Sequence, residues 1–453
     1  MRVKTVQINW HDKLPIFSVD FDHGCQGSGS GAHGGWRFAT GGGDNNVRIW
    51  LLRSPQGHGA DGQSPTIEFL ASLNRHTAPV NVVRFSPQGS RLASAGDDGV
   101  VIIWRQVDAA AAAGVSSAPT VGGLGDEEGK ETWRPAAVLR GSLADICDLA
   151  WSPDGAYLAS ASVDNTARIW DARTARCVQV LADHSHYVQG VAWDPLAQFV
   201  ATQSSDRSLR IYQWTAASGG NGGSSGGGGG GGEVRAGTDV ARLAASHYSM
   251  AGNDGRTRLF HDDNLASFFR RPSVSPDGLL LAAAAGVHRG GNVCHVWARD
   301  RLRQAPVLRL PGMQRPVVAA RWAPCEFDAA GRWVAGARRQ VLAVASQSAV
   351  AVYDTACTTR AVGLMDGLHY AAITDLAWTA DGSHLLIVSV DGFASVASLD
   401  HSAAALPLRA TTAGAAEPQG APQDEPLPHK PAGAEAVAGG GRRRIVPTLV
   451  GSL

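Results

Sequence analysis

An all-β fold built from repeated four-stranded units is predicted by this sequence, and two observations predict it. The first is a recurring phrase that ends in an aromatic residue six positions after an Asp: RFATGGGDNNVRIW, RLASAGDDGVVIIW, YLASASVDNTARIW and FVATQSSDRSLRIY. The second is an alternating apolar run before most copies, closing on a turn, as in ICDLAWSPDG and ITDLAWTADG. Period-two alternation predicts strands, and Ser-Pro-Asp-Gly predicts a hairpin turn.

The repeats predict a closed ring of blades. Units of about 40 to 45 residues with Gly-His and Trp-Asp signatures are typical of WD40 β-propellers. We predict a seven-bladed WD40 β-propeller over residues 1–400 with a disordered C-terminal tail. The blades are expected at roughly 14–52, 75–107, 138–172, 183–214, 245–298, 306–355 and 368–400. The opening strand, Arg2 to Trp10, has no hairpin partner of its own, so we expect it to complete the last blade as the outer strand.

Each blade is expected to bury a polar network of a His before the blade, a Ser or Thr, an Asp and the aromatic residue. A buried His that is hydrogen-bonded to an Asp satisfies the polar groups of such a blade, so the role of these residues is structural and not catalytic. The candidates are His76, Ser94, Asp98, Trp104, Asp164, Trp170, His184, Thr202 and Asp206, with Tyr212 as the aromatic of the last set.

Composition argues against several function classes. Lys plus Arg equals Asp plus Glu at 40 each, so nonspecific nucleic-acid binding is not indicated and DNA is expected to be only an indirect partner. The six cysteines form no CxxC pair, which fits reduced thiols without zinc or disulfides. No apolar run is long enough to span a membrane, and the chain opens on a strand pattern, so we expect a soluble, non-secreted protein with no membrane partner.

Enzyme and metal motifs are missing from the sequence. It has no GxSxG, HExxH or P-loop motif, and GGGDNN at Gly41 lies between two strands, where a phosphate-binding loop would precede a helix. The sets His261-Asp262-Asp263 and His184 with His186 lack a further spaced ligand. We therefore expect no catalysis, no cofactor and no metal.

Three parts of the chain depart from the repeat. Insertions at about 108–132, which is Ala-rich, and 215–236, which contains a poly-Gly run, are expected to be flexible. Ala, Pro, Gly and Glu dominate residues 401–441, a composition typical of a disordered linker. Residues 442–453, RRRIVPTLVGSL, then combine Arg with alternating apolar residues, as a docking peptide would.

The segment RLFHDDNLASFFRRPSVSPDG, residues 258–278, is unlike the other blade entrances. It contains a helical-looking NLASFF, two Phe and a pair of Arg. Two interpretations remain open: a partner surface for a large subunit or histones, or a long packed loop. The candidate residues are His261, Asp262, Asp263, Phe268, Phe269, Arg270 and Arg271.

This segment, together with INWHDKLPIFSVDF, RHTAPVNVVRFSP and HSHYVQGVAWDP, resembles the WD40 middle subunit of chromatin assembly factor 1. The resemblance runs from Met1 to about Asp400 and resumes at the terminal Arg-Arg-Ile-x-Pro. It implies a non-catalytic histone chaperone subunit in the nucleus. The subunit would be a scaffold, joined to large and small subunits, in a complex that deposits histones H3–H4 on newly replicated or repaired DNA.

The terminal residues resemble the B-domain-like peptide that docks onto the anti-silencing histone chaperone. The matching residues are Arg443, Arg444, Ile445, Pro447 and Leu449. Such a peptide can add to a sheet edge, with Ile445 as the apolar anchor and Arg444 as the charge anchor. A fragment of a nuclear localisation signal is the alternative. One departure from the family lies in the third blade, where Arg140, Gly141 and Ser142 replace the usual Gly-His.

Two other functions compete with this interpretation. Ile169 to Arg173, IWDAR, fits the WDxR box of WD40 substrate receptors of cullin-RING ubiquitin ligases, although these residues are also expected at any blade end. A HIR-type subunit, which deposits histones independently of replication, would share the propeller and the tail peptide. The segment FHDDNLASFFRR and the absence of a second long C-terminal domain in this sequence argue against it.

Overall fold

The computed structural model describes residues 2–24, 35–53, 65–107, 130–142, 144–215, 240–247, 249–252, 255–265, 267–325, 339–355 and 360–399. The chain divides into units of residues 1–413 and 414–453, and all described residues belong to the first. The predicted linker 401–441 and docking peptide 442–453 lie outside the described residues, as do nearly all residues of the two predicted insertions.

Seven four-stranded antiparallel sheets confirm the seven-bladed propeller. Blades 1 to 3 are β2 (Ile16–Phe21), β3 (Trp36–Gly42), β4 (Val47–Arg53), β5 (Thr66–Leu73); β6 (Val80–Phe85), β7 (Arg91–Gly96), β8 (Val100–Val107), β9 (Thr132–Arg140); and β10 (Ile146–Trp151), β11 (Tyr157–Ser162), β12 (Ala167–Asp171), β13 (Arg176–Leu181). Blades 4 to 6 are β14 (Val188–Trp193), β15 (Phe199–Ser204), β16 (Leu209–Thr215), β17 (Val240–His247); β20 (Ser273–Val274), β21 (Leu280–His288), β22 (Gly291–Ala298), β23 (Leu308–Met313); and β24 (Val317–Trp322), β25 (Val341–Ser346), β26 (Ala349–Asp354), β27 (Gly363–Asp366). Blade 7 is β28 (Ile373–Trp378), β29 (His384–Ser389), β30 (Ala394–Ser398) and β1 (Arg2–Val6).

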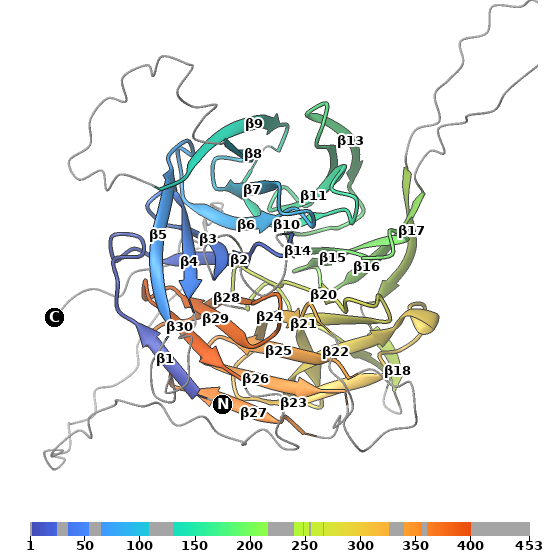
Figure 1. Cartoon of the computed structure of the whole chain (residues 1–453). Helices are drawn as coiled ribbons and strands as arrows, with labels where there is room; N and C mark the ends of the chain where they lie inside the picture. The colour runs from blue at the N-terminus through green and yellow to red at the C-terminus, as the bar shows by residue number, and fades with distance from the viewer. Residues whose placement is uncertain are drawn as a thin grey trace, which may run out of the picture. The chain divides into compact units, whose positions relative to one another are not determined.

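The first strand of each blade lies nearest the ring axis. These strands touch in sequence around the ring, β2 with β6, then β10, β14, β20, β24 and β28, which returns to β2. Figure 1 shows these strands at the centre and the fourth strands, such as β5, β9 and β23, at the periphery. Among the described residues the only helix is a 3-10 turn, η1 (Arg299–Arg301), and none could span a membrane.

Strand β1 closes the ring, as the sequence predicts. It pairs with β30 from Arg2↔Ser398 to Val6↔Ala394, so the two ends of the propeller share one sheet. The side chain of Val3 is 4% exposed and packs in the core of the last two blades. Thr5 Oγ1 also lies 2.8 Å from Ser395 Oγ.

The predicted blade limits need correction. The outer strand of each blade lies beyond the range given to it, and the ranges 245–298 and 306–355 are wrong for blades 5 and 6. Residues 245–247 instead end β17 of blade 4, and β18 (Ser249–Gly252) pairs with β19 (Gly255–Arg258) in a separate hairpin. The reason is that outer strands such as β13 expose most of their side chains, which removes the hydrophobic alternation.

The Ser-Pro-Asp-Gly turns form as predicted between the first and second strands. In blade 3, Gly155 N donates to Ser152 O at 2.8 Å, and Asp154 Oδ1 accepts from Ala156 N at 3.0 Å. Gly155 has a φ of +66°, a conformation that glycine adopts without strain. Blade 5 repeats the turn with Gly278 at +73°.

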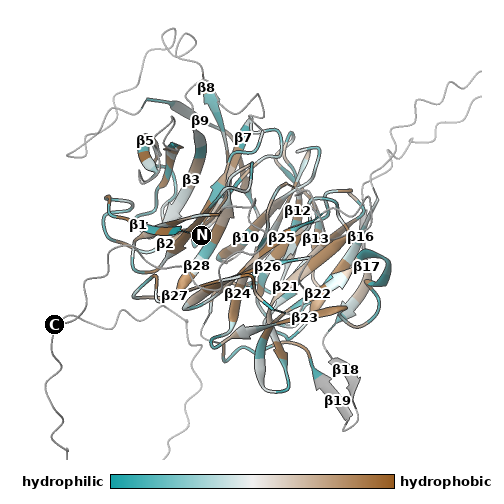
Figure 2. Ribbon diagram, turned by 60° about the horizontal axis from the view of Figure 1, so that its bottom comes forward, coloured by the Kyte–Doolittle hydropathy of each residue, from teal (hydrophilic) through white to brown (hydrophobic). Residues whose placement is uncertain are grey.

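Apolar side chains fill the space between neighbouring blades. Trp10, Phe38 and Trp50 pack with Leu386 and Val396 where blade 1 meets blade 7. Figure 2 shows hydrophobic colouring along inner strands such as β10 and β24, and hydrophilic colouring at many of the connecting turns. Each blade therefore covers the apolar face of the next one.

A β-bulge recurs near the start of the first strand in six blades. In register, the third residues of these strands are Ser18, Val82, Asp148, Gly190, Ala319 and Asp375, and the fifth are Asp20, Arg84, Ala150, Ala192, Arg321 and Ala377. Charged residues thus occur in strands that are otherwise apolar, and these strands lie at the axis.

Candidate functional site

The entrance segment of blade 5, residues 258–272, takes the place of a full first strand. Blade 5 begins with only two paired residues in β20. Before them, Arg270 N donates to Gln189 O at 3.1 Å, Arg271 N donates to Val318 O at 3.0 Å, and Arg271 O accepts from Ala320 N at 3.1 Å. The backbone of the segment therefore bridges blades 4 and 6.

Arg271 extends from this segment across the ring axis. Its Nη1 donates to Phe17 O and Thr374 O, both at 3.0 Å, and its Nη2 donates to Asn81 O at 2.7 Å. The guanidinium also stacks 4.0 Å from the ring centroid of Phe269. One fully buried side chain thus joins blade 5 to blades 1, 2 and 7.

Buried ion pairs surround Arg271. Asp375 Oδ2 lies 2.9 Å from Nη1 of both Arg271 and Arg84, and its Oδ1 lies 3.2 Å from Arg321 Nη2. Asp148 Oδ1 lies 3.1 Å from Arg84 Nη2. Four of the seven first strands, β6, β10, β24 and β28, contribute a charge to this cluster.

The charges of this cluster stabilise one another. Burial alone would raise the pKa of Asp375, but Arg271, Arg84 and Arg321 outweigh it and hold that pKa below its ordinary value. Burial, with Arg84 and Arg321 adding to it, lowers the pKa of Arg271 to about 10. Both groups remain ionised at neutral pH, so the cluster is a set of structural ion pairs.

The structure divides the seven candidate residues of this segment into two groups. Phe269, Arg270 and Arg271 are 4%, 1% and 0% exposed. They do not form an exposed surface, and the interpretation as a long packed loop applies to them. The described residues of NLASFF form turns and bends, so the helix suggested by the sequence is wrong there.

The remaining four residues lie at the surface. Asp263 is exposed, while His261, Asp262 and Phe268 are half-buried. Asp262 pairs with Arg207 at 2.7 Å, and His261 Nε2 lies 2.8 Å from Asn292 Oδ1. No group of three metal-ligating side chains occurs among the residues that the structure describes.

The predicted blade networks form in blades 2 and 4. His76 lies 2.8 Å from Asp98 and 2.7 Å from Ser94, whose Oγ accepts from Trp104 Nε1 at 2.8 Å. In blade 4, His184 lies 2.8 Å from Asp206 and 2.7 Å from Thr202.

Blade 3 keeps only part of this network. Ser142 stands where the His would be and donates to Ser162 at 2.9 Å and to Asp164 at 3.5 Å. Trp170 Nε1 donates to Ser160 at 2.9 Å. The structure thus shows how a serine replaces the histidine.

Two networks escaped the sequence analysis. In blade 1, His11 lies 2.6 Å from Asp44 and 2.8 Å from Thr40, which accepts from Trp50 Nε1 at 2.9 Å. In blade 7, His369 lies 3.0 Å from Asp391. Each His precedes a first strand and lies 22 or 33 positions before its Asp, a spacing that could have revealed it.

The comparisons with known proteins agree with this architecture. The CAF1B/HIR1 beta-propeller domain model matches residues 1–226 and 230–403. This chain belongs to that family. The corresponding chromatin assembly factor 1 subunit of Gallus gallus is 36% identical over 90% of this chain and 69% of the relative. Its counterpart of the same name from Saccharomyces cerevisiae is 36% identical over 88% of this chain and 86% of the relative.

Within the family, the HIR proteins are more distant. Protein hir-1 of Neurospora crassa is 28% identical, and the match covers 79% of this chain and 33% of the relative. The candidate docking residues Arg443, Arg444, Ile445, Pro447 and Leu449 lie outside the described residues.

The WDxR sequence forms an ordinary turn at the end of β12. Asp171 Oδ1 accepts from Arg173 N at 2.8 Å and from Thr174 N at 3.0 Å. These bonds explain the Asp without a ubiquitin-ligase partner.

Proposed function

We propose that this chain is the WD40 subunit of a chromatin assembly factor 1 complex, acting as a non-catalytic histone chaperone subunit. The complex would deposit histones H3–H4 on newly replicated or repaired DNA in the nucleus. The observation that carries the proposal is the 36% identity to the chromatin assembly factor 1 subunit of Gallus gallus over 90% of the chain. The lower identity of the HIR protein, 28%, favours this subunit over a HIR-type one.

The geometry of the ring suits a scaffold. In the networks of blades 1, 2 and 4, both ring nitrogens of the His have partners within the blade. The axial carboxylates are likewise held by arginines. These titratable groups maintain the shape of the ring, which supports a role in binding and not in catalysis.

The exposed end of the blade 5 entrance segment is our candidate contact for the large subunit or for histones. It presents two carboxylates, Asp262 and Asp263, whose side chains are 32% and 55% exposed. Histones are basic, and exposed carboxylates steer a basic partner toward a binding site. His261 and the half-buried ring of Phe268 lie beside them.

Charge reversal tests this contact. Asp262→Lys with Asp263→Lys is expected to weaken capture of either H3–H4 or the large subunit. Asp366→Lys, an exposed site at the end of β27, is the matched control and should leave both unchanged. Equal capture by all three proteins would exclude this surface.

The C-terminal residues supply a second proposed contact. Arg443, Arg444, Ile445, Pro447 and Leu449 would dock onto the anti-silencing histone chaperone, and residues 401–441 would tether this peptide to the ring. A tether raises the local concentration of the histone donor without adding contacts.

A reconstitution experiment tests the proposed function. The full chain is mixed with purified H3–H4, the large subunit and the anti-silencing chaperone, and the wild type is compared with Arg444→Ala plus Ile445→Ala. We expect the wild type to capture all three and the variant to lose only the anti-silencing chaperone. Failure of the wild type to bind the large subunit would overturn the assignment, and absence from replication sites in cells would favour the HIR-type alternative.

A further inference from the structure

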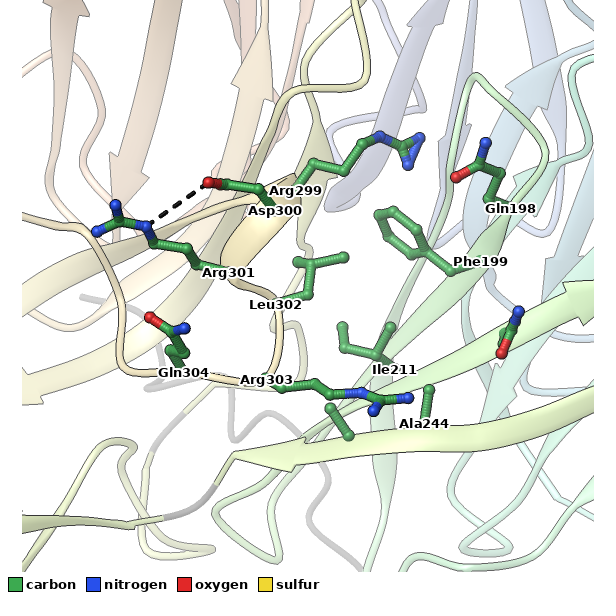
Figure 3. A pocket seen from close by; sticks show the side chains of 12 residues that line it. Gln198, Phe199, Ile211, Ala244, Arg299, Asp300, Arg301, Leu302, Arg303 and Gln304 are labelled. Atoms are coloured by element: carbon green, nitrogen blue, oxygen red, sulfur yellow. Dashed lines mark ion pairs between the residues drawn. The ribbon is translucent and has the colours of Figure 1, made fainter.

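A pocket opens between blades 4 and 5, at the end of the blades opposite the entrance segment. Its volume is about 410 Å³, which falls within the usual range for ligand sites of roughly 300–1,000 Å³. Phe199 and Ile211 form a buried floor, and Leu302 and Ala244 form half-buried walls. Figure 3 shows the apolar side chains of Phe199, Ile211 and Leu302 turned toward one another.

Arginines line the mouth of this pocket. Arg303 is exposed, extends past Leu302 toward Ala244, and has no ion pair among the residues that the structure describes (Figure 3). Arg301 lies 3.6 Å from Asp300, and both side chains are exposed, at 58% and 75%, so this pair is weak. The mouth therefore offers two guanidinium groups to an anionic partner.

A third arginine separates the pocket from an exposed apolar patch. Arg299 holds the buried carboxylate of Asp194 through both terminal nitrogens, with the shortest contact at 2.6 Å. On its other side the turns of blades 4 and 5 meet, and a Cβ added at Gly278 would lie 2.9 Å from Leu196 Cγ and 3.2 Å from Arg299 Nη2. Leu196 and Leu279 are 50% and 55% exposed.

We propose that this surface binds an extended acidic segment of a partner protein that carries bulky apolar side chains. One apolar side chain fills the pocket over Phe199 and Ile211. Carboxylates on either side of it pair with Arg301 and Arg303, since guanidinium forks match carboxylates. A second apolar side chain covers Leu196 and Leu279.

Each part of the surface contributes to this choice of partner. The apolar floor and the exposed leucines favour side chains over a bare anion, and the two available arginines favour carboxylates over a cationic peptide. The patch and the pocket together extend along both turns, which suits a chain and not a compact ligand. The surface lies apart from the residues used in the proposed function, so the two can fail independently.

Two variants and a control define the test. Ala244→Phe fills the pocket, and Arg301→Glu with Arg303→Glu reverses the charge at its mouth. Arg75→Glu with Arg315→Glu, two exposed arginines at the opposite end of the blades, is the control. The charge-reversal pair lies on exposed side chains, so it keeps the test valid if Ala244→Phe does not fold. Thermal unfolding compares the fold of all four proteins.

A phage library of random short peptides is selected on the full wild-type chain, and enriched peptides are measured by fluorescence anisotropy. We expect enrichment of Leu, Ile, Phe or Trp flanked by Asp and Glu. Affinity should fall about tenfold or more in either variant and stay unchanged in the control. Absence of enriched peptides, peptides without acidic residues, equal binding to the variants, or charge-dependent binding of a single-stranded oligonucleotide in place of peptides would each overturn the proposal.

Discussion

At the scale of single residues, the blade 2 network fixes its own protonation. Asp98 is an ionised acceptor, so His76 Nδ1 must carry the hydrogen in their 2.8 Å contact. His76 Nε2 is then an acceptor, and Ser94 donates to it while accepting from Trp104 Nε1. Burial would raise the pKa of Asp98, but the hydrogen bond and charge of His76 outweigh it and lower that pKa.

Ser94→Ala should destabilise the ring through this network. The change leaves His76 Nε2 and Trp104 Nε1 buried without partners, which costs about 1–3 kcal/mol. Urea unfolding followed by tryptophan fluorescence measures the loss. Ser185→Ala is the control, because the backbone nitrogen of Ser185 makes its bond to Asp206. Equal midpoints for the two variants would show that the network contributes nothing.

Asp375→Asn should reduce stability at neutral pH and flatten its dependence on acid. The folded pKa of Asp375 lies below the ordinary 3.8, so near and below that pH the unfolded chain binds more protons. Stability of the wild type is therefore fully present above the unfolded pKa and is lost as pH falls toward the folded one. At neutral pH the variant leaves buried arginines unpaired, at a cost of about 3–5 kcal/mol.

Unfolding midpoints between pH 7 and pH 3 measure this effect. Asp366→Asn, at an exposed site, should keep the wild-type slope. A slope for Asp375→Asn as steep as that of the wild type would mean that other carboxylates dominate acid unfolding.

At the scale of elements, local patterns explain what could be predicted. The Ser-Pro-Asp-Gly turns and the apolar first strands depend on neighbouring residues, so the sequence shows them directly. The partners of Arg271 could not be predicted, because Phe17, Asn81 and Thr374 come together only when the ring closes. A signal was nevertheless present, since a lone Asp interrupts the apolar runs ICDLAW and ITDLAW at the same position.

Gly190→Ala should dislodge the entrance segment from β14. A Cβ at Gly190 would lie 2.0 Å from Arg270 O, a backbone atom that cannot move without displacing Arg271. We expect a loss of about 1–3 kcal/mol, typical of overpacking. Gly291→Ala is the control, because its Cβ would meet nothing closer than 3.5 Å. Urea unfolding compares both with the wild type, and equal stability would show that the segment is loosely held.

At the scale of the whole molecule, the ring depends on one joint between its two ends. Six blades take their four strands from consecutive segments, but blade 7 takes β28 to β30 from one end and β1 from the other. The unpaired opening strand made this joint predictable. The axial ion pairs add a second connection, since Asp375 of blade 7 contacts Arg84 of blade 2 and Arg321 of blade 6.

Deleting residues 1–7 should open this joint while the other blades remain folded. The deletion removes every pair between β1 and β30, the Thr5–Ser395 bond and the buried Val3 side chain. We expect a loss of roughly 3 kcal/mol or more, from one buried Val and a strand of hydrogen bonds. Hydrogen exchange should accelerate in β30 and stay slow in β15. Arg2→Ala with Lys4→Ala, both exposed, is the control. Unchanged exchange in β30 after the deletion would show that the ring closes without β1, through the axial ion pairs and the blade contacts alone.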